Sequence, residues 1–362
     1  MNITRRTAVT MMISATAAPL VGVRGARAQT VIPLTMASSH PLTIAWVAPL
    51  RTIIVERSNA LLEERGSPYR IDWTEAYAGT LYNFNDTLNA VTSGLTDMGW
   101  IGALFEPARL PLQNIMYSTP FATQTVAQAT ATMNRLNAEL ASMQREWARH
   151  DVTFFGSCVS DGYHLFTRRP IESLADLNGM RLMGGAVLAP WVESLGIALV
   201  ASALPNMYNQ IQTGVGEGAI MIGTGAYPLR LHEVAPFVTK VDTGPLTFGG
   251  FGINTDTFNR LPADVQQVLS ELGMEYSVEN ARIITELEAQ VFELFANEGA
   301  TVTDMPEDQR QEWADRLPDL GLAWAEATER SGVADARDIM RQFMQTLREE
   351  GATPLRDWSA NL

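Results

Sequence analysis

The stretch that decides the fold is Arg169-Pro-Ile-Glu-Ser-Leu-Ala-Asp-Leu-Asn-Gly-Met-Arg-Leu-Met183. Its first three residues mark a turn, because proline fixes the backbone and cannot continue a regular element. Ser173–Leu177 then predicts a single turn of helix, and Gly179 leads into a strand over Met180–Met183. A turn, a short helix and a strand in close succession are typical of an α/β unit.

Five elements are predicted toward the amino terminus, and they alternate between strand and helix. Short apolar or alternating runs predict the strands, and longer amphipathic runs predict the helices. The strands are Val31–Ala37, Tyr69–Ala76 and Asp97–Ile101, and the helices are Trp46–Arg65 and Asn83–Ser93. This order is that of a parallel sheet with crossover helices.

A second α/β unit follows toward the carboxyl terminus, after a helical stretch over Ala122–His150. Strands are predicted at Val152–Cys158, Tyr163–Thr167, Ala198–Ala201, Ala219–Ile222, Phe237–Val241 and Gly249–Asn254, and helices at Trp191–Leu195 and Asn206–Thr213. After residue 262 the pattern is helical to the end, apart from Ala300–Asp304. Ligands of open α/β sheets bind at the carboxyl ends of strands, so a cleft between the two units is the expected site.

Residues 1–28 have the pattern of a cleaved signal peptide. Arg5 and Arg6 form a basic head, a weakly apolar run follows, and residues 26–28 (ARA) supply the small residues that a signal peptidase requires. The mature chain is expected to begin at Gln29 or Thr30, in the periplasm. The paired arginines leave the twin-arginine and the general secretory routes both open. The run is too polar for a membrane span, which needs about 20 strongly apolar residues.

The charge and the single cysteine exclude several classes of protein. The formal net charge is −14, and removal of the four arginines in residues 1–28, which contain no acid, makes it −18. Nucleic acid is therefore not an expected partner, because phosphate binding needs a basic face. Cys158 is the only cysteine and can form no disulfide within the chain, so we expect it to be a buried apolar side chain.

The common signatures of enzymes and metal sites are missing from the sequence. Residues 156–160 (GSCVS) lack the second glycine of a nucleophile elbow, and His232-Glu233 is not followed by the second histidine of a zinc helix. The glycines at 223 and 225 have no lysine after them, as a phosphate loop would. We therefore expect no metal and no cofactor. Together with export and the two α/β units, this favours a binding protein over an enzyme.

Residues 169–183 also closely resemble a signature of the TRAP-transporter solute-binding proteins. Three other stretches resemble that family in the same order and spacing: Tyr77-Ala-Gly-Thr-Leu81 with Val91–Met98, then Leu110–Phe121, then Met207–Gly214 followed by Gly218. Each motif is weak alone, but four in register over nearly the whole mature chain make a specific resemblance.

The resemblance implies a periplasmic-binding-protein fold of two α/β lobes that close on a small solute. Lobe I is expected to comprise residues 29–158 with about 247–285, and lobe II residues 159–246 with about 286–362. A long helix late in the chain, around Asn280–Asn297, would cross both lobes. The implied function is that of a receptor, expected to be monomeric, that captures an organic acid by hinge closure and docks on a TRAP membrane permease.

The sequence departs from the family at the positions that the resemblance assigns to the ligand. Met183 stands where most relatives have an arginine that grips the substrate carboxylate, and Met221 where they often have a polar ligand contact. Arg181, two residues before Met183, would either reach the anion or lie on the surface of the lobe. Gly184 and Gly185 would either bring backbone amides to a carboxylate or form a plain turn.

The other candidate ligand contacts are aromatic residues and a histidine. Tyr163 stands where some relatives have a second arginine, and His40 lies on the loop after the first strand. We expect at least one of Trp46, Trp100 and Trp191 in the cleft, although each alone would more often lie in the core. Together with Met183 and Met221 these residues predict an apolar site, which favours an aromatic or hydrophobic acid over a small dicarboxylate.

Two other functions are compatible with the same sequence. A sensory binding protein would hand its closed form to a chemoreceptor or a kinase, and a neighbouring permease gene would argue against it. A secreted enzyme on a similar scaffold would turn over the ligand that it binds.

Overall fold

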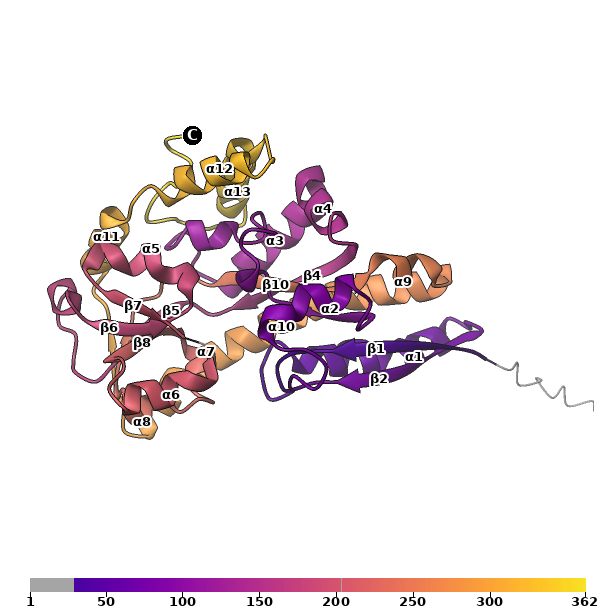
Figure 1. Ribbon diagram of the computed structural model, residues 1–362, viewed down its shortest axis with the longest axis horizontal. Coiled ribbons are helices and arrows are strands. Elements are labelled where there is room, and N and C mark those ends of the chain that lie inside the picture. The colour runs from indigo at the N-terminus through magenta and orange to yellow at the C-terminus, as the bar shows by residue number, and fades with distance from the viewer. Residues whose placement is uncertain (1–28, 203) are drawn as a thin grey trace, which may run out of the picture.

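The computed structural model describes residues 29–202 and 204–362, so the predicted signal peptide at residues 1–28 lies outside the described residues. The described chain forms two sheets that lie side by side with helices around them (Figure 1). The first sheet has the order β2-β1-β3-β10-β4, and its strands are β1 (Thr30–Ala37), β2 (Tyr69–Ala76), β3 (Met98–Ile101), β4 (Val152–Ser160) and β10 (Leu246–Asn254). The second has the order β11-β9-β5-β8-β6-β7, and its strands are β5 (Tyr163–Thr167), β6 (Arg181–Gly184), β7 (Ala198–Ala201), β8 (Gly218–Ile222), β9 (Phe237–Lys240) and β11 (Thr301–Asp304).

Each sheet is parallel in part and takes antiparallel strands from distant parts of the chain. In the first sheet β1 pairs in parallel with β2 and β3, as the β-α-β-α-β pattern predicted. β10, from late in the chain, is inserted antiparallel between β3 and β4. All nine residues of β10 are buried, because a strand in that position has a neighbour on each side. The chain thus passes from the first sheet to the second after β4 and returns after β9. The predicted two-lobe α/β fold is confirmed.

The helices cover both sheets; the sequence predicted some of them individually, and those after residue 262 only as one helical stretch. Their bounds are α1 (Glu56–Glu64), α2 (Thr87–Thr92), α3 (Val126–Glu139), α4 (Ala141–Ala148), α5 (Ala189–Val192), α6 (Leu204–Gln212), α7 (Gly223–Ala226), α8 (Leu231–Val234), α9 (Thr255–Arg260), α10 (Ala263–Asn297), α11 (Glu307–Arg316), α12 (Leu320–Arg330) and α13 (Ala336–Glu349). None of the described helices is long and apolar enough to cross a membrane.

Two predicted helices differ in detail from the structure. The stretch Ala122–His150 forms α3 and α4, because Leu140 between them adopts an extended backbone and packs against the core. No proline or glycine marks this break in the sequence, so packing determines it. The stretch Trp46–Arg65 begins with turns and a π-helical segment over Leu50–Val55 before α1.

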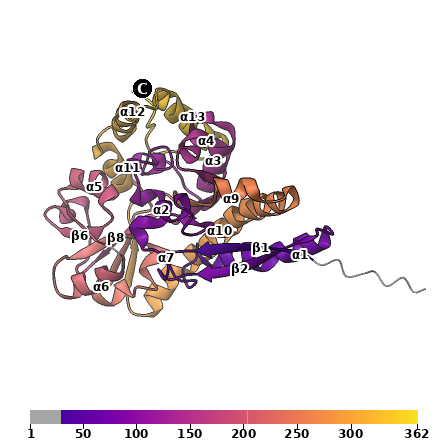
Figure 2. The ribbon, with the colours of Figure 1, turned by 45° about the vertical axis from the view of Figure 1, so that its right-hand side comes forward.

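The long helix α10 crosses both sheets, as predicted. It contacts β4 and α3 near one end and α7 and β11 near the other, and both views show this course (Figures 1 and 2). It can lie directly on β4 because two glycines face each other at the crossing. A Cβ atom on Gly273 would lie 2.3 Å from the Cβ of Phe155, and one on Gly156 would lie 2.7 Å from the carbonyl oxygen of Gly273.

The carboxyl-terminal helices pack against both halves of the molecule. α13 packs on α3, and the Trp358 indole N–H donates to the carbonyl of Pro120 at 3.0 Å. In α11, the Trp313 indole N–H instead donates to the carbonyl of Trp191 at 2.8 Å. The tail is therefore shared between the two halves, and the assignment of residues 286–362 to lobe II alone stays a prediction.

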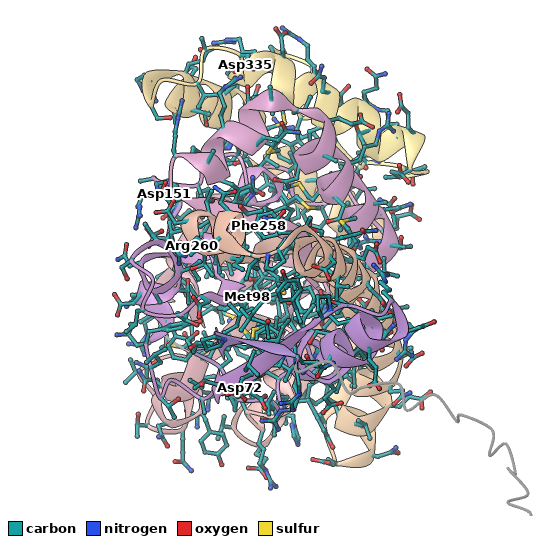
Figure 3. The ribbon with its side chains drawn as sticks, turned by 90° about the vertical axis from the view of Figure 1, so that its right-hand side faces the viewer. Asp72, Met98, Asp151, Phe258, Arg260 and Asp335 are labelled. Atoms are coloured by element: carbon teal, nitrogen blue, oxygen red, sulfur yellow. The ribbon has the colours of Figure 1, made fainter. Side chains whose placement is uncertain are left out.

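Most acidic side chains lie on the outside of the molecule, although Glu146 and Asp161 are buried, and the core is largely apolar. Of the residues labelled in Figure 3, Asp72, Asp151 and Asp335 are exposed and Met98 is fully buried. Cys158 is also fully buried, as predicted, and burial raises the pKa of its thiol to about 12.

Candidate functional site

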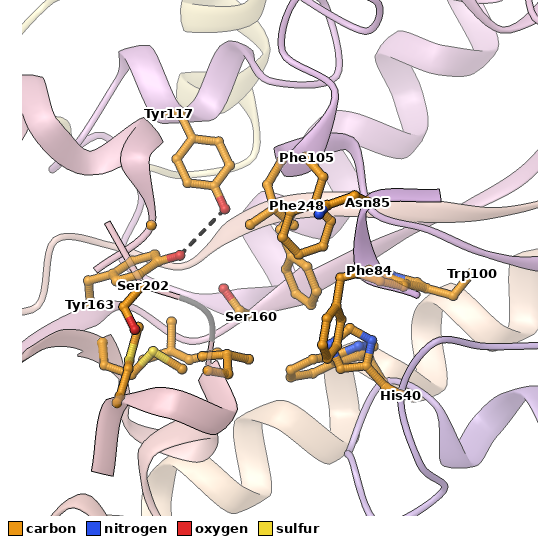
Figure 4. A pocket seen from close by; sticks show the side chains of 17 residues that line it. His40, Phe84, Asn85, Trp100, Phe105, Tyr117, Ser160, Tyr163, Ser202 and Phe248 are labelled. Atoms are coloured by element: carbon orange, nitrogen blue, oxygen red, sulfur yellow. Dashed lines mark hydrogen bonds between the residues drawn. The ribbon is translucent and has the colours of Figure 1, made fainter. Parts of the chain in front are cut away.

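A cavity lies between the two sheets, close to the point where the chain crosses from β4 to β5. Its volume is about 160 Å³, which is close to the roughly 150 Å³ of an apolar cavity that binds benzene. Side chains of both halves line it, and most of them are aromatic or aliphatic. The lining residues are His40, Trp46, Phe84, Asn85, Trp100, Leu104, Phe105, Tyr117, Ser160, Tyr163, Gly185, Ser202, Leu204, Met207, Met221, Ile222 and Phe248 (Figure 4).

The first half contributes an aromatic wall. His40 follows the carboxyl end of β1, Trp100 lies in β3 and Phe248 lies in β10 between β3 and β4, so the strand order brings them together. The rings of His40 and Trp100 meet edge to face at 4.8 Å between centroids, as do those of Trp46 and Phe248. Such contacts fix the ring planes and keep the wall apolar.

His40 is a neutral polar group within this wall. Its Nδ1 is 3.0 Å from the Ser39 hydroxyl, and its backbone N–H donates to the Ser38 hydroxyl at 3.1 Å. Burial lowers the pKa of His40 to about 4, so its ring carries no charge at neutral pH. Its Nε2 has no hydrogen-bond partner within residues 29–202 and 204–362, and it can therefore meet a ligand.

Two tyrosines from opposite halves meet on another side of the cavity. Tyr117 lies in the 3-10 turn Ile115–Ser118, and Tyr163 is the first residue of β5. Their hydroxyl oxygens are 3.5 Å apart and share a hydrogen bond (Figure 4). Burial raises the pKa of Tyr163 to about 12 and that of Tyr117 well above its ordinary value, so both hydroxyls keep their protons.

Trp191 holds the tyrosine pair from behind. Its indole N–H donates to the carbonyl of Tyr117 at 2.7 Å, and its ring meets that of Tyr163 edge to face at 5.7 Å. Tyr163 is also fixed through its backbone, whose N–H donates to the Thr243 hydroxyl at 3.0 Å. Trp191 is thus part of the core that positions the tyrosines and does not line the cavity itself.

The second half contributes a soft apolar wall. Met221 and Ile222 come from β8, and Met207 comes from α6. Gly185 follows β6, and a Cβ atom there would meet only a methyl of Val187 at 3.8 Å. Methionine side chains adapt to ligands of irregular shape, and Gly185 leaves room for one.

The lining that the structure describes contains no lysine or arginine. Asp161, which follows the lining residue Ser160, is a buried acidic residue. Its carboxylate accepts hydrogen bonds from the Thr224 N–H at 3.0 Å and from the Thr224 hydroxyl, while burial raises its pKa to about 6. At neutral pH this group is mostly ionised and disfavours an unpaired anion beside it. Nowhere in the described chain do three or more His, Cys, Asp or Glu side chains gather in a way that could hold a metal ion.

The structure brings six of the ten predicted site residues to the cavity: His40, Trp46, Trp100, Tyr163, Gly185 and Met221. The other four lie elsewhere. Trp191 lies behind the tyrosines, and Gly184 is packed so closely that a Cβ atom would lie 2.9 Å from a methyl of Leu199. Ligand binding by any of the ten stays a prediction.

Arg181 and Met183 share one face of β6, as expected, but that face turns away from the cavity. Met183 is fully buried against Gly216, where a Cβ atom would lie 2.5 Å from the methionine methyl group. Arg181 is exposed and donates to the carbonyl of Gly214 at 3.3 Å. The missing arginine at position 183 therefore leaves no gap in this cavity.

Several lining residues were not singled out from the sequence, notably Phe84, Phe105, Tyr117 and Phe248. Phe84 and Phe105 lie in irregular segments without a motif. Tyr117 lies within the stretch Leu110–Phe121, whose family resemblance could have indicated it. Phe248 needed the strand order, because β10 reaches the cavity only through its insertion beside β3.

Three comparisons place the chain among known proteins. Residues 53–326 match the model of the family described as bacterial extracellular solute-binding protein, family 7. A solute-binding protein of Sulfitobacter sp. (strain NAS-14.1) is 34% identical over 131 residues, which are 34% of this chain and 38% of that relative.

Solved structures with the same fold are more distant in sequence. A marine metagenome TRAP solute-binding protein, described as specific for aromatic acid ligands and solved with 3-hydroxybenzoate, has a TM-score of 0.75 at 18% identity, over 89% of this chain and 100% of its own. A TRAP solute-binding protein from Rhodoferax ferrireducens, solved with copurified benzoate, has a TM-score of 0.73 at 17% identity, over 88% of this chain and 98% of its own.

The resemblance predicted from residues 169–183 is confirmed by the family match, which extends well beyond that signature. It begins within the first helical segment and ends in α12, so it includes both sheets except β1. The structural likenesses support the same fold independently. The chain belongs to family 7 of the bacterial extracellular solute-binding proteins.

Proposed function

We propose that the protein is the periplasmic receptor of a TRAP-type uptake system, which captures a small organic acid with an aromatic body and passes it to a membrane permease. The observation that carries the proposal is the cavity between the two sheets, which is lined by aromatic residues from one half and by methionines from the other. The family is one of solute-binding proteins, and the receptor role follows from it.

Lobe closure is the proposed mechanism of capture. A ligand in this cavity would contact Trp46 and Trp100 from the first half and Met221 from the second. The closed form therefore gains contacts with the ligand that an open form lacks, and only such a difference can shift the equilibrium toward closure. The permease would then recognise the closed form. Export by residues 1–28, a monomeric state and the release of unchanged solute belong to the same proposal.

The apolar lining supports an aromatic acid over a small dicarboxylate. A dicarboxylate brings two charges, and the described lining has no cationic side chain to pair with either. Burial of an unpaired carboxylate costs several kcal/mol, whereas an aromatic ring gains from burial against Trp100 and Phe248. The two solved structures above hold aromatic acids, so this fold is compatible with such a ligand.

A thermal-shift screen with benzoate, 3-hydroxybenzoate and succinate tests the proposal. A ligand at about 100 times its dissociation constant stabilises the native state by about 2.7 kcal/mol, which gives a shift of several degrees. We expect the aromatic acids to raise the melting temperature and to reduce the radius of gyration in small-angle scattering. Mass spectrometry should recover the bound acid unchanged.

Gly185 offers a matched pair of variants for the same screen. Gly185→Phe should fill the cavity and abolish the shift, whereas Gly185→Ala adds one methyl group in ordinary contact and should preserve it. The proposal fails if neither aromatic acid binds, or if the Gly185→Phe variant binds as tightly as the wild type.

A further inference from the structure

The tyrosine pair at the cavity contains a hydrogen-bond donor that the protein itself does not use. Tyr117 and Tyr163 are both buried, and within the described residues each hydroxyl bonds only to the other. Each hydroxyl carries one proton and can accept as well as donate. One proton forms the shared bond, so the second has no acceptor among the residues that the structure describes. A buried donor without a partner is costly, and ligand binding at this place would relieve that cost.

The neighbouring hydroxyls are not equivalent donors, because their own protons go elsewhere. The Ser160 hydroxyl donates to the carbonyl of Asp161 at 3.0 Å, and the Ser202 hydroxyl donates to the side chain of Gln210. The His40 ring is drawn on the other side of the cavity from the tyrosines (Figure 4). The spare tyrosine proton is therefore the distinctive donor on its side of the cavity.

We propose that Tyr117 and Tyr163 form a clamp for the head group of the ligand. An oxygen atom of the ligand accepts a hydrogen bond from the spare hydroxyl, which does the work that a charged side chain would do in another site. This inference rests on the proposed function and specifies its ligand class. The ligands are aromatic compounds with an oxygen acceptor at one end, carboxylates and their uncharged isosteres alike. A site that pairs a carboxylate with a guanidinium would discriminate strongly between these two, because that contact is charge-assisted.

The clamp also links recognition to closure. Tyr117 belongs to the segment between β3 and α3, and Tyr163 begins β5 of the second sheet. Their hydroxyls meet only when the two halves lie together, so the donor arrangement is complete only in the closed form. An acceptor oxygen then favours closure, which a purely apolar contact with one wall would not do.

Calorimetry with benzoate and benzamide on the wild type and on Tyr117→Phe, Tyr163→Phe and the double variant tests the clamp. Tyr208→Phe is the matched control, because it removes a hydroxyl that bonds to Glu233 on the surface. We expect benzamide to bind the wild type within about tenfold of benzoate, and Tyr163→Phe to weaken both by roughly fivefold or more. Tyr117→Phe should weaken binding as well, because either single substitution breaks the pair and leaves one hydroxyl, and the effects of the two substitutions should not be additive.

The dependence of the two affinities on ionic strength is a second measurement, and it tests whether a charged side chain holds the ligand. Between about 0.01 M and about 1 M salt the Debye length falls from about 30 Å to about 3 Å, yet the affinity for benzamide should stay constant and that for benzoate should change by less than about threefold. Unfolding midpoints of each variant show whether the fold is intact.

The outcomes separate the clamp from the proposed function. If neither probe binds the wild type, the proposed function fails and the clamp fails with it. If both bind but Tyr163→Phe and the double variant alter affinity no more than Tyr208→Phe does, the clamp alone is refuted. Tight binding of benzoate with a more than thousandfold loss for benzamide would also refute it, because such a ratio requires a charged partner.

Discussion

Replacement of Glu288 by glutamine should stabilise the protein, and increasingly so as the pH rises. Glu288 lies on α10, and its side chain is partly buried. Burial, together with the negative charges of Asp161 and Asp242, raises its pKa to about 8, against the opposing effects of the Gly162 N–H and Lys240. The native state therefore favours the protonated carboxyl.

The magnitude follows from the difference between folded and unfolded states. The unfolded chain releases this proton near pH 4.5 and the native state near pH 8, so between these values the native state binds more protons. The free energy of unfolding then falls as the pH rises through this window. A shift of about 3.5 units at about 1.36 kcal/mol each sets an upper limit near 5 kcal/mol. Partial exposure and coupling to two carboxyls reduce it, and we expect about 2 kcal/mol.

Melting temperatures of the wild type and of Glu288→Gln between pH 4 and pH 9 provide the assay. Glutamine keeps the shape and an acceptor oxygen but cannot ionise. The two proteins should melt together near pH 4, and the variant should melt about 4 °C higher near pH 9. Glu293→Gln is the control, because Glu293 is an exposed residue of the same helix. A difference between Glu288→Gln and wild type that stays constant across the whole pH range would refute the reasoning.

Three further predictions follow from the packing and the charges. Met183→Ala should lower the free energy of unfolding by about 2–4 kcal/mol in a urea titration, because Met183 is buried in the core. The affinity for benzoate should not change, because the side chain lies away from the cavity. A loss of affinity without a loss of stability would contradict this placement. Gly273→Ala should destabilise by about 1–3 kcal/mol in the same titration, since its methyl group collides with Phe155, whereas Met274→Ala on the exposed side of α10 should cost little. The melting temperature of the wild type should fall as the pH is lowered from about 6.5 to about 4, because the unfolded chain protonates His40 before the native state does. His40→Gln should make this fall smaller. An equal fall in both proteins would contradict the lowered pKa of His40.

The order of elements could be read from the sequence because it depends on local patterns. Hydrophobic periodicity, glycines and prolines located the strands from β1 to β10 to within a few residues, and they set Ala300–Asp304 apart from the helical pattern without predicting it as a strand. The same local signals gave the α/β class, whereas the long helix late in the chain was implied by the family resemblance. They failed at Leu140, where packing against the core breaks a helix that the sequence would continue.

The candidate site was only partly accessible to the same reasoning. Residues at the carboxyl ends of predicted strands, such as His40 and Trp100, could be chosen because parallel strands present these ends together. Arg181 and Met183 were rightly placed on one face of their strand, but periodicity does not say which face meets the cavity. That depends on which elements cover β6, and such contacts join residues far apart in the chain.

The sequence by itself therefore determined the class, the strands and the family of this protein, because each rests on residues that are neighbours in the chain. Tertiary structure alone decided that β10 lies between β3 and β4 and brings Phe248 to the cavity. It also decided that Tyr117 and Tyr163 meet across the two halves, 46 positions apart in the chain. The physical reason is that the order of the strands and the packing of the two lobes depend on which element buries the apolar face of which other element. A single segment of sequence does not specify the element that will cover its own apolar face.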